Sequence, residues 1–341
     1  MNDIEQEYRQ IVEKAAIGEL APTVQLAVAG ADRASFLQGL LTNDIQALKE
    51  GSGCYSAWLT PQGRMLTDMH VLESDGMILL DVPAAQAEAT AARLEQFLFS
   101  EDVKIGSLAG ALATVWVHGP GAASALEQAL DGASGLGDWA QYRHAHVGFA
   151  GESLVLARID QLAVPGYCAF LSGGRRDDLV AALEAAGARP VGAGAMAAAR
   201  IEAAYPLFGV DMNADTIPLE AGIEARGIST SKGCYVGQEV IIRVLHRGHG
   251  RVARKLVTLK LEAPGAEPRS KVFDGDREVG YVTSAAVSPS SGAIALAYVH
   301  RDFVVDDARV AVDTPAGRVA ATVAVRPVRG AVRPPDLLTG D

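Results

Sequence analysis

The stretch that organises this chain is Lys232-Gly233-Cys234-Tyr235-Val236-Gly237-Gln238-Glu239, the signature octapeptide. It combines a thiol, an ammonium, a carboxylate, an amide and two glycines, and such glycines suit backbone that turns tightly or lets another segment approach closely. If residues 237–246 form a helix, Cys234 lies just before its first turn, where unpaired N–H groups and the helix dipole favour a thiolate or a bound anion. The alternative is a buried cysteine in a turn that serves packing alone.

Lys232 favours the first interpretation, because a nearby ammonium lowers the pKa of a thiol. A thiolate at Cys234 would suit redox chemistry, a mixed disulfide, or transient contact with a persulfide or an iron–sulfur cluster. Typical cluster sites use several cysteine ligands, so this single cysteine could only share a cluster with another protein. Cys234 and Lys232 are therefore the first candidate catalytic residues.

The composition is typical of a soluble globular protein. The 341 residues are 49% hydrophobic and 21% charged, and a chain of this length exceeds one ordinary core, so two or three domains are expected. The net charge of −11 argues against direct nucleic-acid binding, and no apolar run is long enough to span a membrane. The acidic beginning of the chain lacks the features of a secretory signal.

Three cysteines, Cys54, Cys168 and Cys234, stand far apart in the chain. Their odd number argues against a disulfide framework and favours a reducing compartment. The spacing of cysteines and histidines does not match that of a metal site built by one segment. We therefore expect a cytoplasmic protein without a metal centre.

Apolar periodicity indicates two α+β units in the first part of the chain. Residues 23–105 predict a β-α-β-β-β-α-β unit. In a second unit, over residues 114–186, the strand–glycine–helix phase seen at Gly30 recurs at Gly119. We interpret the two units as an internal pseudo-repeat of ferredoxin-like halves.

After Arg251 the pattern changes to short strands separated by glycine turns, which predicts a small β-barrel or sandwich. A loose tail is expected at the end of the chain, where two prolines follow one another. The predicted domains are a discontinuous first domain of 1–110 and 190–250, a second ferredoxin-like domain of 111–189, a barrel of 251–330 and a flexible tail of 331–341.

The octapeptide resembles the signature of YgfZ-type folate-binding proteins, relatives of the glycine-cleavage T protein (aminomethyltransferase). This resemblance implies an α+β fold of two ferredoxin-like α/β units plus a C-terminal small β-barrel. The three domains would form a ring that holds tetrahydrofolate in its central opening, with the first domain binding the folate. Further segments similar to motifs of that superfamily are LQGLLTND at 37–44, LTPQGRMLTD at 59–68, RIEAAYPLFG at 200–209 and PLE at 218–220.

Folate presents three different surfaces to a protein. Its pterin has an edge of donors and acceptors that suits a carboxylate, its aminobenzoate suits an apolar slot, and its glutamate tail suits arginine or lysine. By resemblance, Glu202 is the carboxylate that reads the pterin, although a helix-surface glutamate is the alternative. Arg243 and Arg251 are candidate anion contacts or, alternatively, solvated ion-pair partners. The remaining cofactor-binding candidates come from the octapeptide and are Tyr235, Gln238 and Glu239.

Asp68 is the third candidate catalytic residue. The resemblance places it in a strand where T-protein relatives carry an acidic pair, one member of which helps a folate nitrogen take up a one-carbon unit. This chain has Thr67-Asp68 there, so one acid remains. A plain solvent-facing position is the alternative for Asp68.

The resemblance implies a tetrahydrofolate-binding accessory protein that supports assembly or repair of iron–sulfur enzymes, including tRNA-modifying ones, through Cys234. The first alternative is a folate-dependent transferase of an aminomethyl or methyl group, and the second is an adaptor with a vestigial pocket. Besides folate, the expected partners are iron–sulfur enzymes or cluster-assembly proteins, bound transiently by a monomer.

Overall fold

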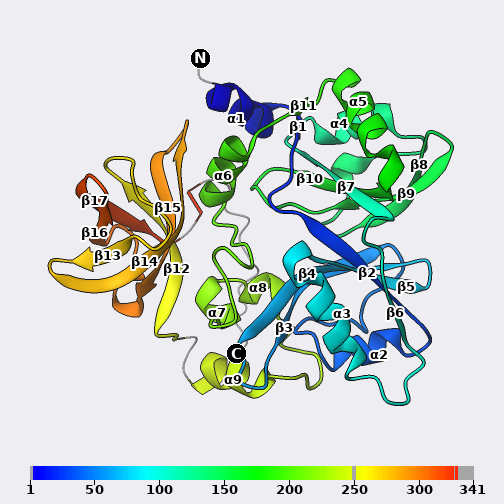
Figure 1. The fold of residues 1–341 in the computed structure, drawn as a ribbon, viewed down its shortest axis with the longest axis horizontal. Helices are drawn as coiled ribbons and strands as arrows, with labels where there is room; N and C mark the ends of the chain where they lie inside the picture. The colour runs from blue at the N-terminus through cyan, green and yellow to red at the C-terminus, as the bar shows by residue number, and fades with distance from the viewer. Residues whose placement is uncertain (1–2, 248–250, 326, 329–341) are drawn as a thin grey trace.

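The computed structural model describes residues 3–247, 251–325 and 327–328. Figure 1 shows two sheet-and-helix bodies and a barrel around a column of short helices. The predicted α+β class, with two α/β units and a C-terminal barrel, is confirmed. Within the described ranges, no helix is long and apolar enough to cross a membrane. The predicted tail, 331–341, lies outside the described residues.

The first body is a five-stranded sheet covered on one face by helices. Leu26 and Val28 of the sheet are fully buried against Leu37 and Leu94 of the helices, because period-two alternation directs these strand side chains to one face. The strands in spatial order are β3 (Ser52–Leu59), β4 (Met65–Ser74), β5 (Met77–Pro83), β2 (Thr23–Ala29) and β6 (Lys104–Ser107). The helices are α2 (Arg33–Gln38), the 3-10 turn η1 (Ala84–Gln86) and α3 (Ala87–Glu95).

The second body repeats this topology. Its strands in spatial order are β8 (His144–Phe149), β9 (Glu152–Arg158), β10 (Gly166–Ser172), β7 (Leu112–His118), β1 (Ala16–Ile17) and β11 (Arg189–Pro190). Its helices are α4 (Ala122–Ala129), η2 (Leu136–Asp138), η3 (Gly173–Arg175) and α5 (Arg176–Ala185). The shared order of the four equivalent strands, β3-β4-β5-β2 and β8-β9-β10-β7, shows the internal repeat.

One short strand lies outside the body that its sequence position predicts. Residues 16–17 fall within the predicted first domain, but β1 pairs with β7 and β11 of the second sheet. A two-residue strand carries no periodicity of its own, so its partner is decided by tertiary hydrogen bonding. The other domain boundaries stay predictions.

The third body is a closed six-stranded barrel, which leaves no free sheet edge. Its interior is filled by small and β-branched side chains such as Val257, Val282, Ala297 and Val312. In spatial order the strands are β12 (Arg254–Leu261), β15 (Gly292–His300), β14 (Arg277–Ser288), β13 (Lys271–Asp274), β16 (Arg309–Thr314) and β17 (Gly317–Ala324), with the turn η5 (Arg301–Phe303) after β15.

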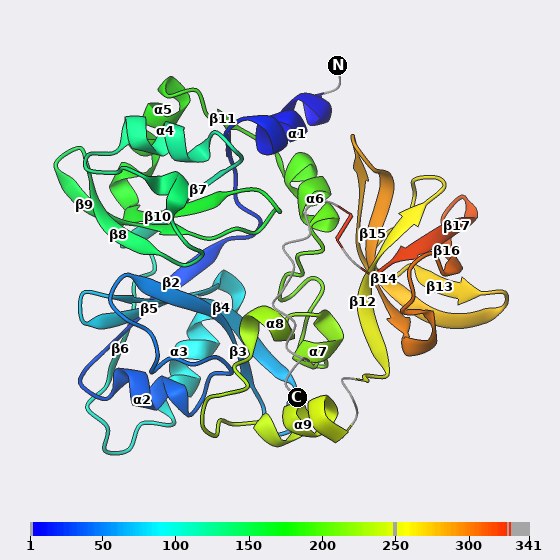
Figure 2. The ribbon, with the colours of Figure 1, turned by 180° about the vertical axis from the view of Figure 1, so that it is seen from behind.

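A column of helices joins the three bodies, as the opposite views of Figures 1 and 2 show. At its upper end, Tyr8 and Ile11 of the first helix pack against Met196 and Ala199 of α6. The elements of the column are α1 (Asp3–Glu13), α6 (Ala193–Glu202), α7 (Pro218–Ala221), α8 (Glu224–Gly227), α9 (Gln238–Ile242) and a π-helical turn, η4 (Arg243–Arg247).

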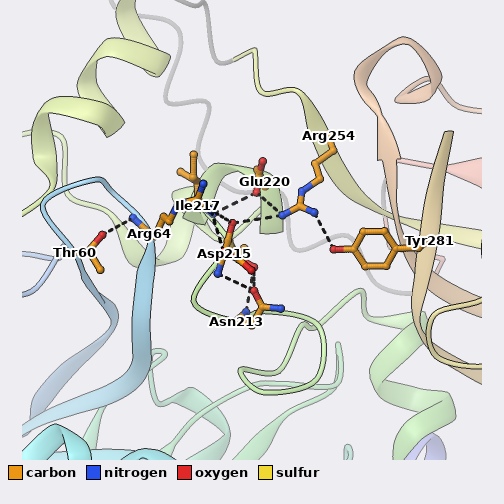
Figure 3. Close-up of polar contacts among 9 residues, drawn as sticks. Thr60, Arg64, Asn213, Asp215, Ile217, Glu220, Arg254 and Tyr281 are labelled. Atoms are coloured by element: carbon orange, nitrogen blue, oxygen red, sulfur yellow. Dashed lines mark hydrogen bonds and ion pairs between the residues drawn. The ribbon is translucent and has the colours of Figure 1, made fainter. Parts of the chain in front are cut away.

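The loop before α7 ties the first sheet to the barrel (Figure 3). Arg64, at the tip of the β3–β4 hairpin, donates to the carbonyl oxygen of Asp215 at 2.7 Å. From the barrel, Arg254 donates to the carbonyl oxygen of Asp215 at 3.4 Å and to Glu220 Oε2 of α7 at 3.3 Å, and it also donates to the Tyr281 hydroxyl of β14 at 2.9 Å. The loop is therefore held from both sides by arginine side chains.

A buried ion pair fastens the column to the barrel. Arg200 Nη1 lies 2.6 Å from Asp211 Oδ2, and their side chains are 6% and 0% exposed. Thr283 and Ser284 of β14 each donate to Asp211 Oδ1 at 2.6 Å. Both charges are thus buried with hydrogen bonds, the condition under which a buried pair is tolerated.

Replacing Asp211 by alanine is expected to lower the free energy of unfolding by about 3–5 kcal/mol, because Arg200 is left buried without its counter-charge. Urea denaturation followed by circular dichroism measures the loss. Asp313→Ala is the matched control, since Asp313 pairs with Arg318 where the side chains are 44% and 39% exposed, and should lose less than about 1 kcal/mol. Equal losses in both variants would contradict this account of the junction.

Candidate functional site

A hollow opens where the first sheet, the second sheet and the loop after α6 meet. Its empty volume, including the solvent space of its open mouth, is about 540 Å³. Aromatic and apolar side chains make most of its wall, and a few polar groups converge on it. The lining residues are Leu20, Ala21, Thr23, Tyr55, Asp68, Met69, His70, Asp81, Pro83, Trp116, Gln161, Tyr205, Pro206, Leu207 and Phe208.

Asp68 lies in this hollow, as the resemblance implies, and not on a plain surface. It is paired with Ala57 across the β3–β4 ladder, and the Tyr55 hydroxyl donates to its Oδ2 at 2.6 Å. Burial raises the pKa of the Asp68 carboxyl, while the Tyr55 hydrogen bond and the Arg226 charge oppose that rise. The hollow therefore contains a carboxyl group that is held in place and shifted toward its protonated form.

His70, two residues further along β4, is a neutral part of the wall. Burial, followed by the Arg226 charge, lowers the pKa of His70 to about 3. The amide nitrogen of Gln161 lies 3.4 Å from ring Nε2 and can only donate, so Nε2 accepts and Nδ1 carries the hydrogen. Nδ1 lies 3.2 Å from the Tyr142 hydroxyl, which completes the pairing of the ring.

Arg226 of α8 is a functional group that the sequence did not indicate. Its guanidinium lies between the rings of Tyr55 and Tyr205, 4.5 and 4.1 Å from their centroids. Its Nε and Nη2 are buried and lack a hydrogen-bond partner among the described residues. Only the fold could reveal this cation, because its partners come from β3 and from the loop after α6.

Asp81 of β5 is a second carboxyl in the hollow that sequence reasoning missed. It is 1% exposed, and its Oδ1 accepts a hydrogen bond of 2.8 Å from the Gln25 amide. Oδ2 is buried and has no hydrogen-bond partner in the described part of the chain. Burial raises the pKa of Asp81 to about 6, against the lowering effect of the Thr23 and Gln25 side chains.

The signature octapeptide lies at the tip of the β3–β4 hairpin and is not part of the lining of the hollow. Gly237 has φ +85°, and a Cβ there would stand 2.4 Å from the carbonyl oxygen of Thr60. Only glycine fits this close approach, as the glycine pattern predicts. Asp68 lies three residues beyond Met65, where β4 leaves the tip, which is about 10 Å along the strand.

Lys232 has a structural task in this arrangement. Its ammonium donates to the carbonyl oxygens of Gln38, Leu41 and Asn43 at 2.8, 2.6 and 2.7 Å, and so satisfies backbone groups at the end of α2. These bonds use all three of its N–H donors, so none remains for the thiol of Cys234.

Cys234 is exposed, and its thiol has no hydrogen-bond partner among the described residues. The predicted helix begins at Gln238, with Gly237 as its N-cap. Cys234 therefore precedes the helix, and its side chain does not cap the first turn. Because Cys234 is exposed, it is not the buried cysteine of the alternative interpretation. The reactivity of its thiol stays a prediction. Within the described ranges, no three histidine, cysteine or acidic side chains come together as metal ligands.

Glu202 is engaged by hydroxyl groups away from the lining of the hollow. Its Oε1 accepts from Ser288, Ser290 and Ser291 of the β14–β15 hairpin, and its Oε2 accepts from the Tyr8 hydroxyl at 2.5 Å. Burial alone would raise the pKa of this carboxyl, but these hydrogen bonds lower it below its usual range. Glu202 thus joins α1, α6 and the barrel, and its reading of a pterin stays a prediction.

The remaining predicted contacts also lie outside the lining of the hollow. Tyr235 is buried among apolar side chains, and burial raises its pKa to about 12. Gln238 is half-buried, whereas Glu239, Arg243 and Arg251 are exposed. The sequence-predicted residues are therefore dispersed: Asp68 lies in the hollow, Gly237 brings the octapeptide to the hairpin tip, and Glu202 lies between α1, α6 and the barrel.

Comparisons with known proteins agree over nearly the whole chain. Residues 1–228 match the family model of the GCVT N-terminal domain, and residues 254–328 match that of the glycine cleavage T-protein C-terminal barrel domain. The aminomethyltransferase of Thermosynechococcus vestitus is 29% identical over 328 residues, 96% of this chain and 88% of that protein. The aminomethyltransferase of Rubrobacter xylanophilus is 31% identical over 299 residues, 87% of this chain and 79% of that protein.

A solved structure has the same fold. The glycine cleavage system aminomethyltransferase T from Bartonella henselae superposes with a TM-score of 0.84 at 23% identity, covering 96% of this chain and 90% of that one. This likeness confirms the predicted three-part fold. It concerns the fold alone and says nothing about the residues in the hollow.

Replacing Asp81 by asparagine is expected to stabilise the protein above neutral pH. The carboxyl has a pKa of 3.8 in the unfolded chain and about 6 in the folded one, so stability is lost as the pH rises through that window. The loss at about pH 8 amounts to about 3 kcal/mol, which the variant avoids.

Urea denaturation at about pH 4 and about pH 8 measures this difference. Asp81→Asn should gain stability over the wild type at the higher pH only. Asp276→Asn, on the exposed turn between β13 and β14, should behave like the wild type at both. A gain that is independent of pH would contradict the raised pKa of Asp81.

Proposed function

The chain belongs to the glycine cleavage T-protein family, and on that premise we propose that it binds a reduced folate in the hollow and transfers a one-carbon unit. The observation that carries the proposal is the position of Asp68. A carboxyl group with a raised pKa lines a hollow together with the aromatic side chains of Tyr55, Trp116 and Tyr205.

The residues of the hollow fit a folate. Trp116, Tyr205 and Phe208 offer apolar and aromatic surface for flat rings, while Asp68 and Asp81 offer acceptors for N–H groups. The unpaired Oδ2 of Asp81 is the kind of buried polar atom that a bound ligand satisfies. These features support tetrahydrofolate, or a one-carbon-substituted form, as the ligand.

A bound tetrahydrofolate supplies amine nitrogens that accept a one-carbon unit. Asp68 holds or accepts a proton beside them, because its raised pKa brings its protonation equilibrium closer to neutral pH. The Tyr55 hydroxyl fixes Oδ2 and so orients the carboxyl. Thr67, which stands in place of a second acid, is buried and donates to a backbone carbonyl, so β4 contributes one carboxylate here.

The curated relatives support the transferase over the accessory role. Those compared above are named aminomethyltransferase, and this chain spans 88% and 79% of their lengths. An aminomethyl group on a carrier is therefore the substrate class that we propose first, and a methyl donor is the second.

A YgfZ-type accessory role is the second proposal, and the exposed thiol of Cys234 supports it. An exposed thiol on the octapeptide is accessible to an iron–sulfur enzyme or a cluster-assembly protein, as a mixed disulfide or transient cluster contact requires. The protein would act as a cytoplasmic monomer that meets these partners transiently, without contact to nucleic acid or membrane. Both roles use the same folate-binding hollow.

Asp68→Asn is expected to lower turnover with lipoyl-bound aminomethyl groups about 100-fold or more, because asparagine cannot hold or accept the proton. The dissociation constant for tetrahydrofolate should change by less than about threefold, since asparagine keeps the acceptor for Tyr55. Stopped turnover assays and calorimetric titration measure the two quantities. Full turnover in the variant would refute the role of Asp68.

Cys234→Ala separates the two proposals. If the transferase role is correct, the variant should match the wild type in both folate affinity and aminomethyl turnover, because Cys234 lies outside the lining of the hollow. If the accessory role is correct, the variant should fail to restore iron–sulfur enzyme activity in a strain that lacks this factor, while it still binds folate. Exposed Ser231→Ala is the matched control and should restore that activity.

A further inference from the structure

Arg226 of α8 is a cation that has no counter-charge within hydrogen-bond distance in the described part of the chain. Its Nε and Nη2 atoms are buried and lack a hydrogen-bond partner among the described residues. Arg200, by contrast, lies 2.6 Å from the carboxylate of Asp211. A charge that is removed from water is costly unless a counter-charge or hydrogen bonds compensate it. The burial of Arg226 therefore has to be compensated in another way.

Two aromatic rings take the place of a counter-charge. The guanidinium carbon lies 4.5 Å from the ring centroid of Tyr55 and 4.1 Å from that of Tyr205. A cation over a ring face is attracted by the electrons of the ring, most strongly where water is excluded. This contact leaves the positive charge in place, whereas an ion pair would neutralise it. The charge of Arg226 therefore acts on its neighbours through a medium that screens it weakly.

The Tyr55 side chain links this charge to Asp68. Arg226 lies over the ring, and the hydroxyl of the same side chain donates to Asp68 Oδ2 at 2.6 Å. Burial raises the pKa of Tyr55 well above its usual value, so the hydroxyl keeps the hydrogen that it donates. A cation over a phenol ring withdraws electron density from it, which makes the hydroxyl a stronger hydrogen-bond donor to the carboxylate.

Resting on the proposed function, we propose that Arg226 is a positioning residue for the transfer reaction, which acts through Tyr55 to keep the Asp68 carboxylate free to accept a proton. Burial favours the protonated form of this carboxyl, and a carboxylic acid cannot take a proton from a folate nitrogen. Arg226 opposes that effect from outside the lining of the hollow, so it acts without touching the ligand.

The other titratable groups around Asp68 do not supply this effect. Burial lowers the pKa of His70, on the same strand, to about 3, so its ring is neutral. Tyr205, in the loop after α6, and Tyr142, before β8, have raised pKa values and are neutral as well. Asp81 of β5, when ionised, repels a negative charge on Asp68. None of these groups is positive, so the effect is left to the guanidinium.

The first test is the pH profile of turnover with lipoyl-bound aminomethyl groups. In Arg226→Gln, the apparent pKa on the acid side of the profile should rise by about 1, the effect of removing a nearby opposite charge. Turnover on the plateau at higher pH should change by less than about threefold, because the ligand contacts are intact. Arg226→Lys retains a cation and should reverse about half of the change or more.

The matched control is Arg143→Gln, because Arg143 is an exposed guanidinium 5.2 Å from the centroid of Trp139. This variant should leave the pH profile unchanged. Circular dichroism establishes that each variant is folded. If Arg226→Gln does not fold, Arg226→Met takes its place, since methionine packs between rings without a charge.

A second measurement does not depend on turnover. Nuclear magnetic resonance of the full chain, isotope-labelled at its aspartate carboxyl groups, gives the titration midpoint of Asp68, whose signal is identified by its absence in Asp68→Asn. Arg226→Gln should raise this midpoint, and so should Tyr55→Phe, which lacks the hydrogen bond to Oδ2. In the Tyr55→Phe chain, Arg226→Gln should add less than about half of its effect in the wild type, because the two side chains act together.

An unchanged midpoint of Asp68 in Arg226→Gln and Arg226→Met would overturn this inference while leaving the proposed function intact. The full effect of Arg226→Gln in the Tyr55→Phe chain would also overturn it, because the charge would then act without Tyr55. A wild-type chain that binds no reduced folate and shows no turnover would overturn the proposed function and the role in the reaction. The midpoints of Asp68 would still report whether Arg226 controls this carboxyl.

Discussion

The buried carboxylate of Asp211 is the contact on which the ring depends. Apolar clusters also join the bodies, the two sheets to each other and α6 to the barrel. Asp211 adds a buried charge to the second of these junctions, where it accepts from Arg200 of the column and from Thr283 and Ser284 of the barrel. Buried charges are tolerated only when they are paired and hydrogen-bonded, so this junction specifies one relative placement of column and barrel. Asp211 belongs to the loop after α6, whose residues Tyr205 to Phe208 also line the hollow.

The octapeptide joins the lower part of the helix column to the first sheet body. The Lys232 ammonium binds three carbonyl groups at the end of α2, and Gly237 allows the chain to pass against Thr60 at the hairpin tip. Most of this motif is therefore explained by backbone geometry and hydrogen bonding. Cys234 is the member that these structural tasks leave free, since its side chain is exposed.

The electrostatics of the hollow result from burial more than from pairing. Burial moves the pKa values of Asp68 and Asp81 upward and that of His70 downward, so the hollow carries less charge than its residue list indicates. Arg226 partly offsets the rise at Asp68 while remaining behind the tyrosine rings. The result is a weakly charged, largely aromatic site with two acceptors, which suits a flat ligand with N–H donors.

The sequence by itself determined the class of fold, the internal repeat and the barrel, because periodicity and turn residues are local properties of the chain. Asp68 was indicated only by the resemblance of its hairpin segment to a motif of the T-protein superfamily. Only the tertiary structure decided the partners of each side chain. It engaged Glu202 with serines from the barrel, gave Lys232 to backbone carbonyls, brought Asp81 to the hollow, and placed Arg226 against the ring of Tyr55. These contacts join segments far apart in the chain, and burial, which sets their pKa values, exists only after the bodies have packed together.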